Sequence, residues 1–219
     1  FFLLIILKIN KQFSLSETKS VLIFLVTMMF VVLVNDKNLE FFDIMLSLTS
    51  SISNSGLYFG YNQNINIFFL LITVFVGGSL LSNSGGFKIT RFLIIFKNIL
   101  SEFSKLLIPA SITNLSIYNS SEKIKSYDLF ISSLVLFTYF LMMILYCFFL
   151  SFENINFENI FKISFLVSFN TLPSSLYGIN EVNFSNFNNL TLLISLIVFV
   201  LSKITPLSFI LLIKNFLLR

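Results

Sequence analysis

The chain has 219 residues, of which 11% are charged and 56% are hydrophobic, and its formal net charge is +4. Soluble domains carry about 25% charged residues, so this chain has too few to cover a water-exposed surface. Its 14 basic residues are spread along the chain without a basic run, which argues against nucleic-acid binding. Composition therefore predicts an integral membrane protein whose surroundings are the lipid bilayer.

Histidine is absent, and the single cysteine, Cys147, lies within an apolar run. One thiol cannot form an internal disulfide, and a chain without histidine lacks the commonest general base and metal ligand. No nucleophile or acid pair has the spacing of a catalytic site. We therefore expect a protein that is not an enzyme and holds no cofactor of its own, with Cys147 as a small buried hydrophobic residue.

Apolar segments in the first half of the chain predict one unit of two long helices and one short helix. A membrane-spanning helix needs about 20 mostly apolar residues. Residues 1–12 are too short for one, and we expect them to be the tail of a preceding helix. The unit at residues 13–104 divides into an outer helix at about 16–34, a short helix at about 39–50, a polar turn at 51–57 and a long helix at about 65–96, broken at 77–86.

The same order of segments returns in residues 105–219. This unit divides into an outer helix at about 127–152, a short helix at about 156–169, a polar turn at 170–175 and a long helix at about 188–218, interrupted at residues 202–206. Asn54 and Asn170 stand at equivalent points of the two units, 116 positions apart. Pore and transporter folds are often built from such repeats. The sequence thus predicts an all-α, multi-pass membrane fold made of two tandem units.

The placement of charge predicts the orientation of these units. Most basic residues fall on one side of the membrane in this topology: Lys8, Lys11, Lys19, Lys88, Arg91, Lys97, Lys105, Lys123, Lys125, Lys214 and Arg219. Cytoplasmic segments carry an excess of Lys and Arg, so this side is expected to be cytoplasmic. The two short helices then enter the membrane from the outside.

The break at residues 77–86 contains four glycines inside an otherwise apolar run. Each glycine weakens a helix interior by about 1 kcal/mol relative to alanine. Irregular backbone at membrane depth is tolerated only where it is buried in protein or lines a watery cavity. The break therefore indicates a pathway through the membrane.

The polar turns that follow the short helices are candidate ion-binding segments. A short helix that enters from one side and ends in a turn places backbone carbonyls, and the negative end of its dipole, inside the membrane. The candidate residues are Ser53, Asn54, Ser55 and Gly56 in the first unit, and Asn170, Thr171 and Leu172 in the second. An ordinary extracellular turn is the alternative, because Asn, Ser and Gly are common turn residues.

Lys203 lies deep in the last apolar segment. A lysine there costs several kcal/mol unless it is paired or hydrated. Pro206 frees a backbone carbonyl nearby, and Lys214 is about eleven residues further on. We favour a functional role for Lys203 over the alternative that its side chain extends to the cytoplasmic interface.

Three features resemble the Trk/Ktr/HKT superfamily of potassium and sodium transporters. The segments Val76–Ser79 and Gly85–Arg91 look like that family's GGSxGSTAGGIKxxR motif, and Lys105–Leu106 with Ile108–Ala110 looks like the hP-a element after it. The third feature is the repeated unit itself. The family has four units around one pore, and this chain resembles the third and fourth, the C-terminal half.

The resemblance implies a function and a set of site residues. It implies transport of K⁺, or of Na⁺, through a carbonyl filter in which Gly56 is a filter glycine. It also implies an intramembrane gate made by Gly77, Gly78, Ser79, Ser82, Ser84, Gly85 and Gly86, with Lys203 in place of the family's usual arginine facing that loop. Its further implications are a homodimer, a cytosolic nucleotide-binding regulatory subunit of the TrkA/KtrA type, and the bacterial inner membrane.

The sequence departs from the family pattern in the second turn. Leu172 stands where the fourth filter is expected to have glycine, and Leu80 and Leu81 make the glycine break more apolar than the family motif. A degenerate or structural membrane component that keeps the fold without a selective filter is therefore the second hypothesis.

Overall fold

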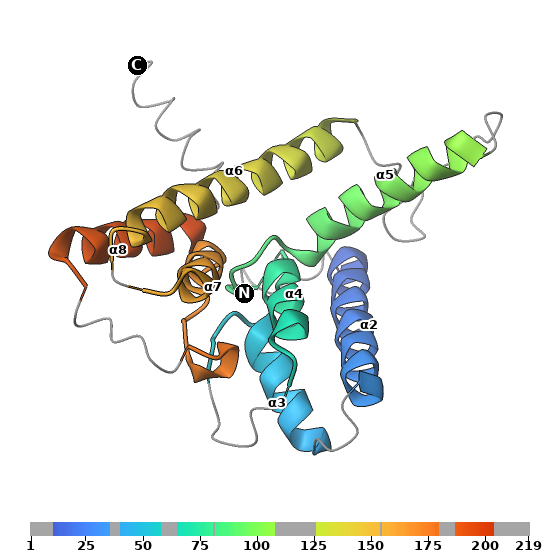
Figure 1. The fold of residues 1–219 in the computed structure, drawn as a ribbon. Helices are drawn as coiled ribbons and strands as arrows, with labels where there is room; N and C mark the ends of the chain where they lie inside the picture. The colour runs from blue at the N-terminus through green and yellow to red at the C-terminus, as the bar shows by residue number, and fades with distance from the viewer. Residues whose placement is uncertain are drawn as a thin grey trace, which may run out of the picture.

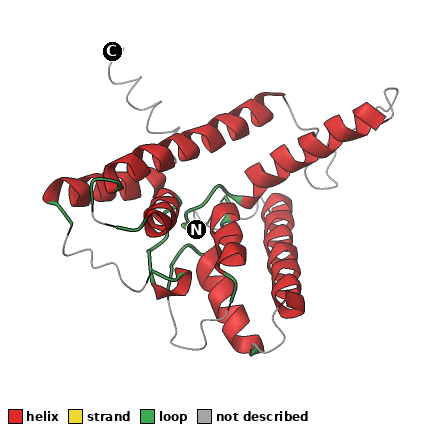
Figure 2. Cartoon of the chain, in the orientation of Figure 1, coloured by secondary structure: helices red, strands yellow, loops and turns green. Residues whose placement is uncertain are grey.

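The computed structural model describes residues 11–35, 40–57, 65–80, 82–107, 126–153, 155–179 and 187–203, with the side chains of 11–16 left out (Figure 1). The predictions for residues 1–10 and 204–219, Pro206 and Lys214 included, lie outside this part of the chain. The helices are α2 (Lys11–Asn35), α3 (Phe41–Ile52), α4 (Ile67–Val76), α5 (Ile89–Leu107), α6 (Ser126–Leu150), α7 (Phe157–Ser168), the 3₁₀ turn η1 (Ser175–Tyr177) and α8 (Asn189–Lys203). Within the described residues all regular structure is helical, as predicted (Figure 2).

Two predicted helix ends are wrong. The described part of α2 starts at Lys11, so residues 11 and 12, expected in the tail at 1–12, are already part of this helix. The helix α5 continues to Leu107, well past the expected end at residue 96. Lys97 marks one face of an amphipathic helix and does not end it, and Lys105 pairs with Glu102 one turn away, at 2.7 Å.

The two short helices end in the same backbone motif, 116 residues apart. After α3, the N–H groups of Asn54 and Ser55 donate to the carbonyls of Ser51 and Ser50. After α7, Asn170 and Thr171 donate to Val167 and Leu166 with the same sequence offsets. Asn54 and Asn170 have φ of 56° and 58°, so each is the left-handed residue of a Schellman cap. The equivalence predicted for these asparagines is confirmed at the level of the backbone.

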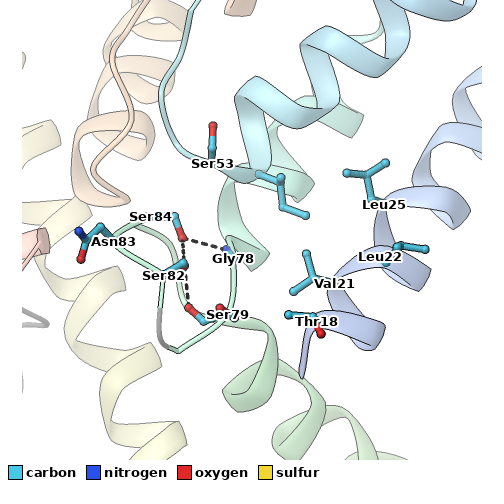
Figure 3. A pocket seen from close by; sticks show the side chains of 11 residues that line it. Thr18, Val21, Leu22, Leu25, Ser53, Gly78, Ser79, Ser82, Asn83 and Ser84 are labelled. Atoms are coloured by element: carbon cyan, nitrogen blue, oxygen red, sulfur yellow. Dashed lines mark hydrogen bonds between the residues drawn. The ribbon is translucent and has the colours of Figure 1, made fainter. Parts of the chain in front are cut away.

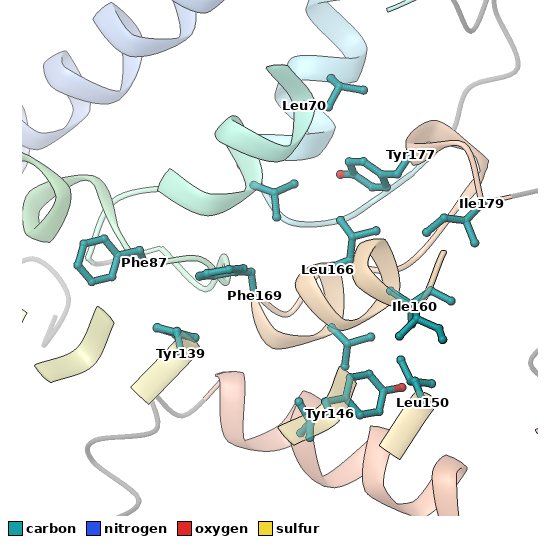
Figure 4. Close-up of a cluster of buried hydrophobic side chains, with 14 of the residues drawn as sticks. Leu70, Phe87, Tyr139, Tyr146, Leu150, Ile160, Leu166, Phe169, Tyr177 and Ile179 are labelled. Carbon is teal, nitrogen blue, oxygen red and sulfur yellow. The ribbon is translucent and has the colours of Figure 1, made fainter. Parts of the chain in front are cut away.

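The two repeats lie beside each other. In Figure 1, α2, α3 and α4 form one group and α6, α7 and α8 the other, and α5 packs on α6. A shared core joins them, in which Leu70 of α4 and Tyr139 of α6 are buried with Leu166 and Phe169 (Figure 4). The Phe169 ring stacks on Tyr139 with ring centroids 5.1 Å apart. This core fixes the second polar turn against the first unit.

Two described helical segments are long and apolar enough to cross a membrane, Glu17–Asn35 and Ser126–Leu150. Both present large apolar side chains at the surface, among them Phe30 on α2 and Phe137 on α6, which are exposed by 68% and 67%. Contiguous apolar surface of this kind is rare on soluble monomers and usual against lipid or protein. The apolar outer helices agree with the membrane protein predicted from composition.

Asn54 gives a direct test of the Schellman caps. Replacement of Asn54 by Ala forces a Cβ-bearing residue without a local polar side chain into left-handed geometry, and removes the buried hydrogen bonds that the amide shares among three acceptors. We expect the N54A substitution to cost about 2–4 kcal/mol of unfolding free energy. Asn54→Gly is the matched control, because it keeps the backbone geometry and loses only the side-chain bonds. Thermal unfolding of purified protein in detergent measures both, and equal losses would contradict the backbone contribution.

Candidate functional site

The two polar turns, far apart in the sequence, meet in the structure. The Ser174 hydroxyl donates to the carbonyl oxygen of Gly56, at 2.6 Å. A Cβ built on Gly56, which has φ of +67°, would lie 2.3 Å from the carbonyl oxygen of Leu172. Only glycine fits there, because both the backbone conformation and the space exclude a side chain. The candidate filter segments of the two units are therefore direct neighbours.

The Asn54 side chain joins three segments beneath this contact. Its amide Nδ2 lies 3.2 Å from the carbonyl oxygen of Val74, 3.1 Å from that of Phe169 and 2.9 Å from the Thr171 hydroxyl, so its two N–H groups are shared among three acceptors. The amide oxygens of Asn54 and Asn170 are both buried without a hydrogen-bond partner among the described residues. Buried acceptors without a donor are rare, and here they occur at the same point of each repeat.

The glycine break is a compact loop that folds back across the end of α4. Gly77 and Gly86 both have positive φ, at 64° and 82°, and a Cβ on Gly86 would lie 2.8 Å from the Cα of Gly77. The N–H of Phe87 donates to the carbonyl of Phe75 at 2.9 Å, and that of Ile89 to Gly78 at 3.1 Å. The glycines thus let two backbone segments of one loop touch. Leu81, within the loop, lies outside the described residues.

The glycine loop docks on the second polar turn. The Gly86 N–H donates to the carbonyl of Phe169 at 3.1 Å, the same oxygen that accepts from Asn54. A Cβ on Gly85 would lie 2.2 Å from that oxygen. Tyr139 adds a link from α6, since its hydroxyl lies 3.4 Å from the carbonyl of Gly86 and 3.2 Å from that of Ser202. The loop is therefore held against both units.

The loop is also polar inside. The hydroxyls of Ser82 and Ser84 lie 2.6 Å apart, Ser82 donates to the carbonyl of Ser79, and the Gly78 N–H donates to Ser84 (Figure 3). A cavity of about 640 Å³ lies between this loop, the end of α3 and the first turns of the spanning part of α2. Its lining is Thr18, Val21, Leu22, Leu25, Ile52, Ser53, Gly78, Ser79, Ser82, Asn83 and Ser84 (Figure 3).

Two lysines contrast with the expectation for this site. Lys203 is the last described residue of α8 and its side chain is exposed, whereas its neighbour Ser202 is buried. Lys88, predicted as a cytoplasmic charge and as part of the motif segment Gly85–Arg91, is buried against the loop with its Nζ 3.0 Å from the carbonyl of Ser82. The sequence did hold a sign of this position, because Lys88 stands two residues after the last glycine of the break. Cys147, expected to be buried, is half-buried.

No protein-family model matches the chain. A curated sequence with similarity, an uncharacterized cation transporter of Methanocaldococcus jannaschii, is 27% identical over 105 residues, which are 47% of this chain and 22% of that protein. The crystal structure of the potassium transporter TrkH from Vibrio parahaemolyticus matches with a TM-score of 0.75 and 16% identity, covering 90% of this chain and 44% of the solved one. The chain thus spans less than half the length of either protein.

The comparisons confirm the predicted resemblance at the level of the fold. The chain has the fold of 44% of the solved TrkH chain, a share that fits two of four units. Both matching proteins are described as transporters and neither as an enzyme, which supports the expectation that this chain is not an enzyme. The chain is a membrane protein with a transporter fold.

Gly85 and Gly78 give a matched pair for testing the docked loop. Gly85→Ala places a methyl group against the Phe169 carbonyl, a backbone atom that cannot move alone, whereas the methyl of Gly78→Ala meets only the serine hydroxyls of Ser84 and Ser82 at 2.6 and 2.7 Å. We expect the G85A substitution to cost about 1–3 kcal/mol of unfolding free energy and G78A clearly less. Thermal unfolding in detergent checks the order, and the reverse order would contradict the docking of the loop on Phe169.

Proposed function

We propose that this chain is the C-terminal half of a membrane cation transporter of the Trk/Ktr/HKT superfamily. The observation that carries the proposal is the pair of identical Schellman caps with Asn54 and Asn170, each followed by a non-helical turn, with the glycine loop beneath them. The fold shared with TrkH supports the same proposal. Two of the four units cannot enclose a pore, so the proposal requires two further units to complete it.

The proposed ion pathway runs past the two turns. The C-terminal ends of α3 and α7 bring the negative ends of their helix dipoles to Ser53–Gly56 and Asn170–Leu172. Backbone carbonyls of these residues replace water around a monovalent cation. We propose K⁺ as this cation, with Na⁺ as the alternative. No acidic side chain lies within either turn, as expected for a filter of carbonyls.

The proposed gate is the loop made by Gly77, Gly78, Ser79, Ser82, Ser84, Gly85 and Gly86. The hydrogen bond from Gly86 to the Phe169 carbonyl holds this loop next to the second turn. The Asn54 amide, which contacts the Val74 carbonyl at the end of α4, lies beside it. Lys203 stays a proposed neighbour of this gate. Its side chain is exposed, whereas Lys88 contacts the loop directly, so the contacts support Lys88 more strongly as the cation beside the gate. A homodimer, a cytosolic nucleotide-binding regulatory subunit and the bacterial inner membrane complete the proposal by resemblance.

Leu172 favours a second candidate function. Its side chain is 57% exposed, and its carbonyl oxygen lies against Gly56 at the point where the two turns meet. A leucine at this position has fewer allowed backbone conformations than a glycine would have, so it restricts the shape of the turn. A structural membrane component that retains the fold without a selective filter is therefore the alternative.

Cation uptake by the full-length protein tests the proposal. We expect it to restore growth and K⁺ (or Na⁺) uptake in a host that lacks its own K⁺ uptake systems. The control is Gly56→Ala, which should abolish uptake because a Cβ overlaps the Leu172 carbonyl. Correct membrane insertion without uptake of either ion would contradict the proposal.

Replacement of Leu172 by Gly separates the two candidate functions. If the turn is a filter restricted by leucine, we expect L172G to raise K⁺ uptake several-fold, because glycine reaches backbone angles closed to leucine. Isotope or thallium flux into cells measures the change, with L172A as the control for loss of the side chain alone. No flux in the parent, L172A or L172G protein supports the structural component instead.

A further inference from the structure

Lys88 lies in an oxygen-lined site made by the glycine loop itself. Its Nζ is 3.0 Å from the carbonyl oxygen of Ser82 and also contacts the carbonyl oxygen of Ser84. The hydroxyl oxygens of Ser82 and Ser84 lie 3.5 and 3.4 Å from the same nitrogen. Lys88 is only 7% exposed and has φ of +79°, which is unusual for a residue with a side chain. Four oxygens from two loop residues thus surround one buried ammonium group.

A buried carboxylate lies on the other side of the same loop. Glu17, on α2, is 2% exposed and lies close to the backbone N–H of Leu80. Its Oε2 has no hydrogen-bond partner among the described residues. Glu17 and Lys88 have side chains of opposite charge near the same loop, and Arg91 is a further cation near Lys88. The loop is thus contacted by an acid from α2 at Leu80 and by a base from the start of α5 at Ser82 and Ser84.

Burial of either charge alone would be unfavourable. An isolated ion moved out of water costs several kcal/mol, and the cost falls when an opposite charge and hydrogen-bonding groups are close by. Here the ammonium has carbonyl and hydroxyl oxygens together with the charge of Glu17, and the carboxylate has the Leu80 N–H together with the charge of Lys88. Each charge is tolerated because the loop lies between them in this conformation.

We propose that Glu17 and Lys88 form a charged latch that holds the glycine loop closed on the second turn, with the Lys88 ammonium acting as a tethered monovalent cation in the loop's own oxygen site. Both are positioning residues, since they act through the loop. The latch stands on the loop contacts, and only its effect on flux rests on the proposed function. The competing explanation is that the Lys88 side chain merely fills space.

A reporter thiol on the loop measures the latch without measuring transport. Asn83 is exposed and lies between Ser82 and Ser84, so Asn83→Cys in a Cys147→Ala background of the full-length protein places a reporter thiol on the loop. Its rate of reaction with a charged thiosulfonate reagent in membrane vesicles depends on how the loop presents the thiol to water, so a change in that rate between variants reports a displaced or more mobile loop. Uptake by the same variants, measured in parallel, shows whether loop release opens a pathway.

We expect Lys88→Met to raise the reaction rate about tenfold, the scale of one charge-assisted hydrogen bond. Glu17→Gln, which keeps the size of the side chain, should raise the rate less, because an amide oxygen can still face the Leu80 N–H and the oxygens around Lys88 are unchanged. The double variant E17Q/K88M should not exceed K88M, since the two charges act as a pair. Lys105→Met is the matched control: Lys105 pairs with Glu102 on the exposed end of α5, so its loss should leave the rate unchanged.

Chemical rescue distinguishes a tethered cation from a packing role. In the Lys88→Ala variant, ethylammonium should enter the vacated oxygen site and slow the reaction of the reporter thiol toward the parental rate, whereas ethanol, similar in size and neutral, should not. Equal rescue by both, or an unchanged rate in K88M, K88A and E17Q, would overturn the latch. A reporter that responds as expected in a protein without uptake would leave the latch standing and contradict only the proposed function.

Discussion

The carbonyl oxygen of Phe169 is the point on which the arrangement of the candidate site depends. It accepts one hydrogen bond from the Asn54 amide and one from the Gly86 N–H, both at 3.1 Å. These donors come from the first polar turn and from the glycine loop, and the acceptor caps α7 in the second unit. One backbone oxygen therefore fixes the positions of the first turn, the glycine loop and the end of α7 relative to one another. It is free to accept both bonds because the left-handed Asn170 beside it ends the helix at a Schellman cap.

This constraint explains why the glycines are where they are. Gly85 leaves room for the Phe169 oxygen, Gly77 and Gly86 let the two sides of the loop touch, and Gly56 leaves room for the Leu172 carbonyl. Each glycine lies at a close approach of backbone to backbone, which a side chain of any kind would prevent. The loss of helix stability that the glycines cause in an apolar segment is offset by contacts that join the two units.

The sequence predicted the helices and the repeat because those features are local. Long uncharged runs such as residues 129–150 have few alternatives in a chain of this composition, and Asn54 and Asn170 mark the ends of short helices by their own chemistry. The dock of the loop on Phe169 could not be predicted, because it joins residues more than eighty positions apart through backbone atoms. The length of α5 was missed because Lys97 looked like a boundary, although a cation is equally compatible with the polar face of a continuing helix.

Lys203 and Lys88 show how context misleads a search for functional charges. Lys203 drew attention because its neighbours are apolar, yet its side chain is exposed at the end of the described α8, whereas Lys88 follows a polar loop and is buried by that loop folding back on it. The sequence does not predict the burial of Glu17 either, since an acid near a helix start is usually a solvated N-terminal residue. Because the loop contacts Phe169 on one side and Lys88 on the other, a displacement of the whole loop breaks both sets of contacts. Movement of the loop is therefore expected to be a transition between two states and not a gradual shift.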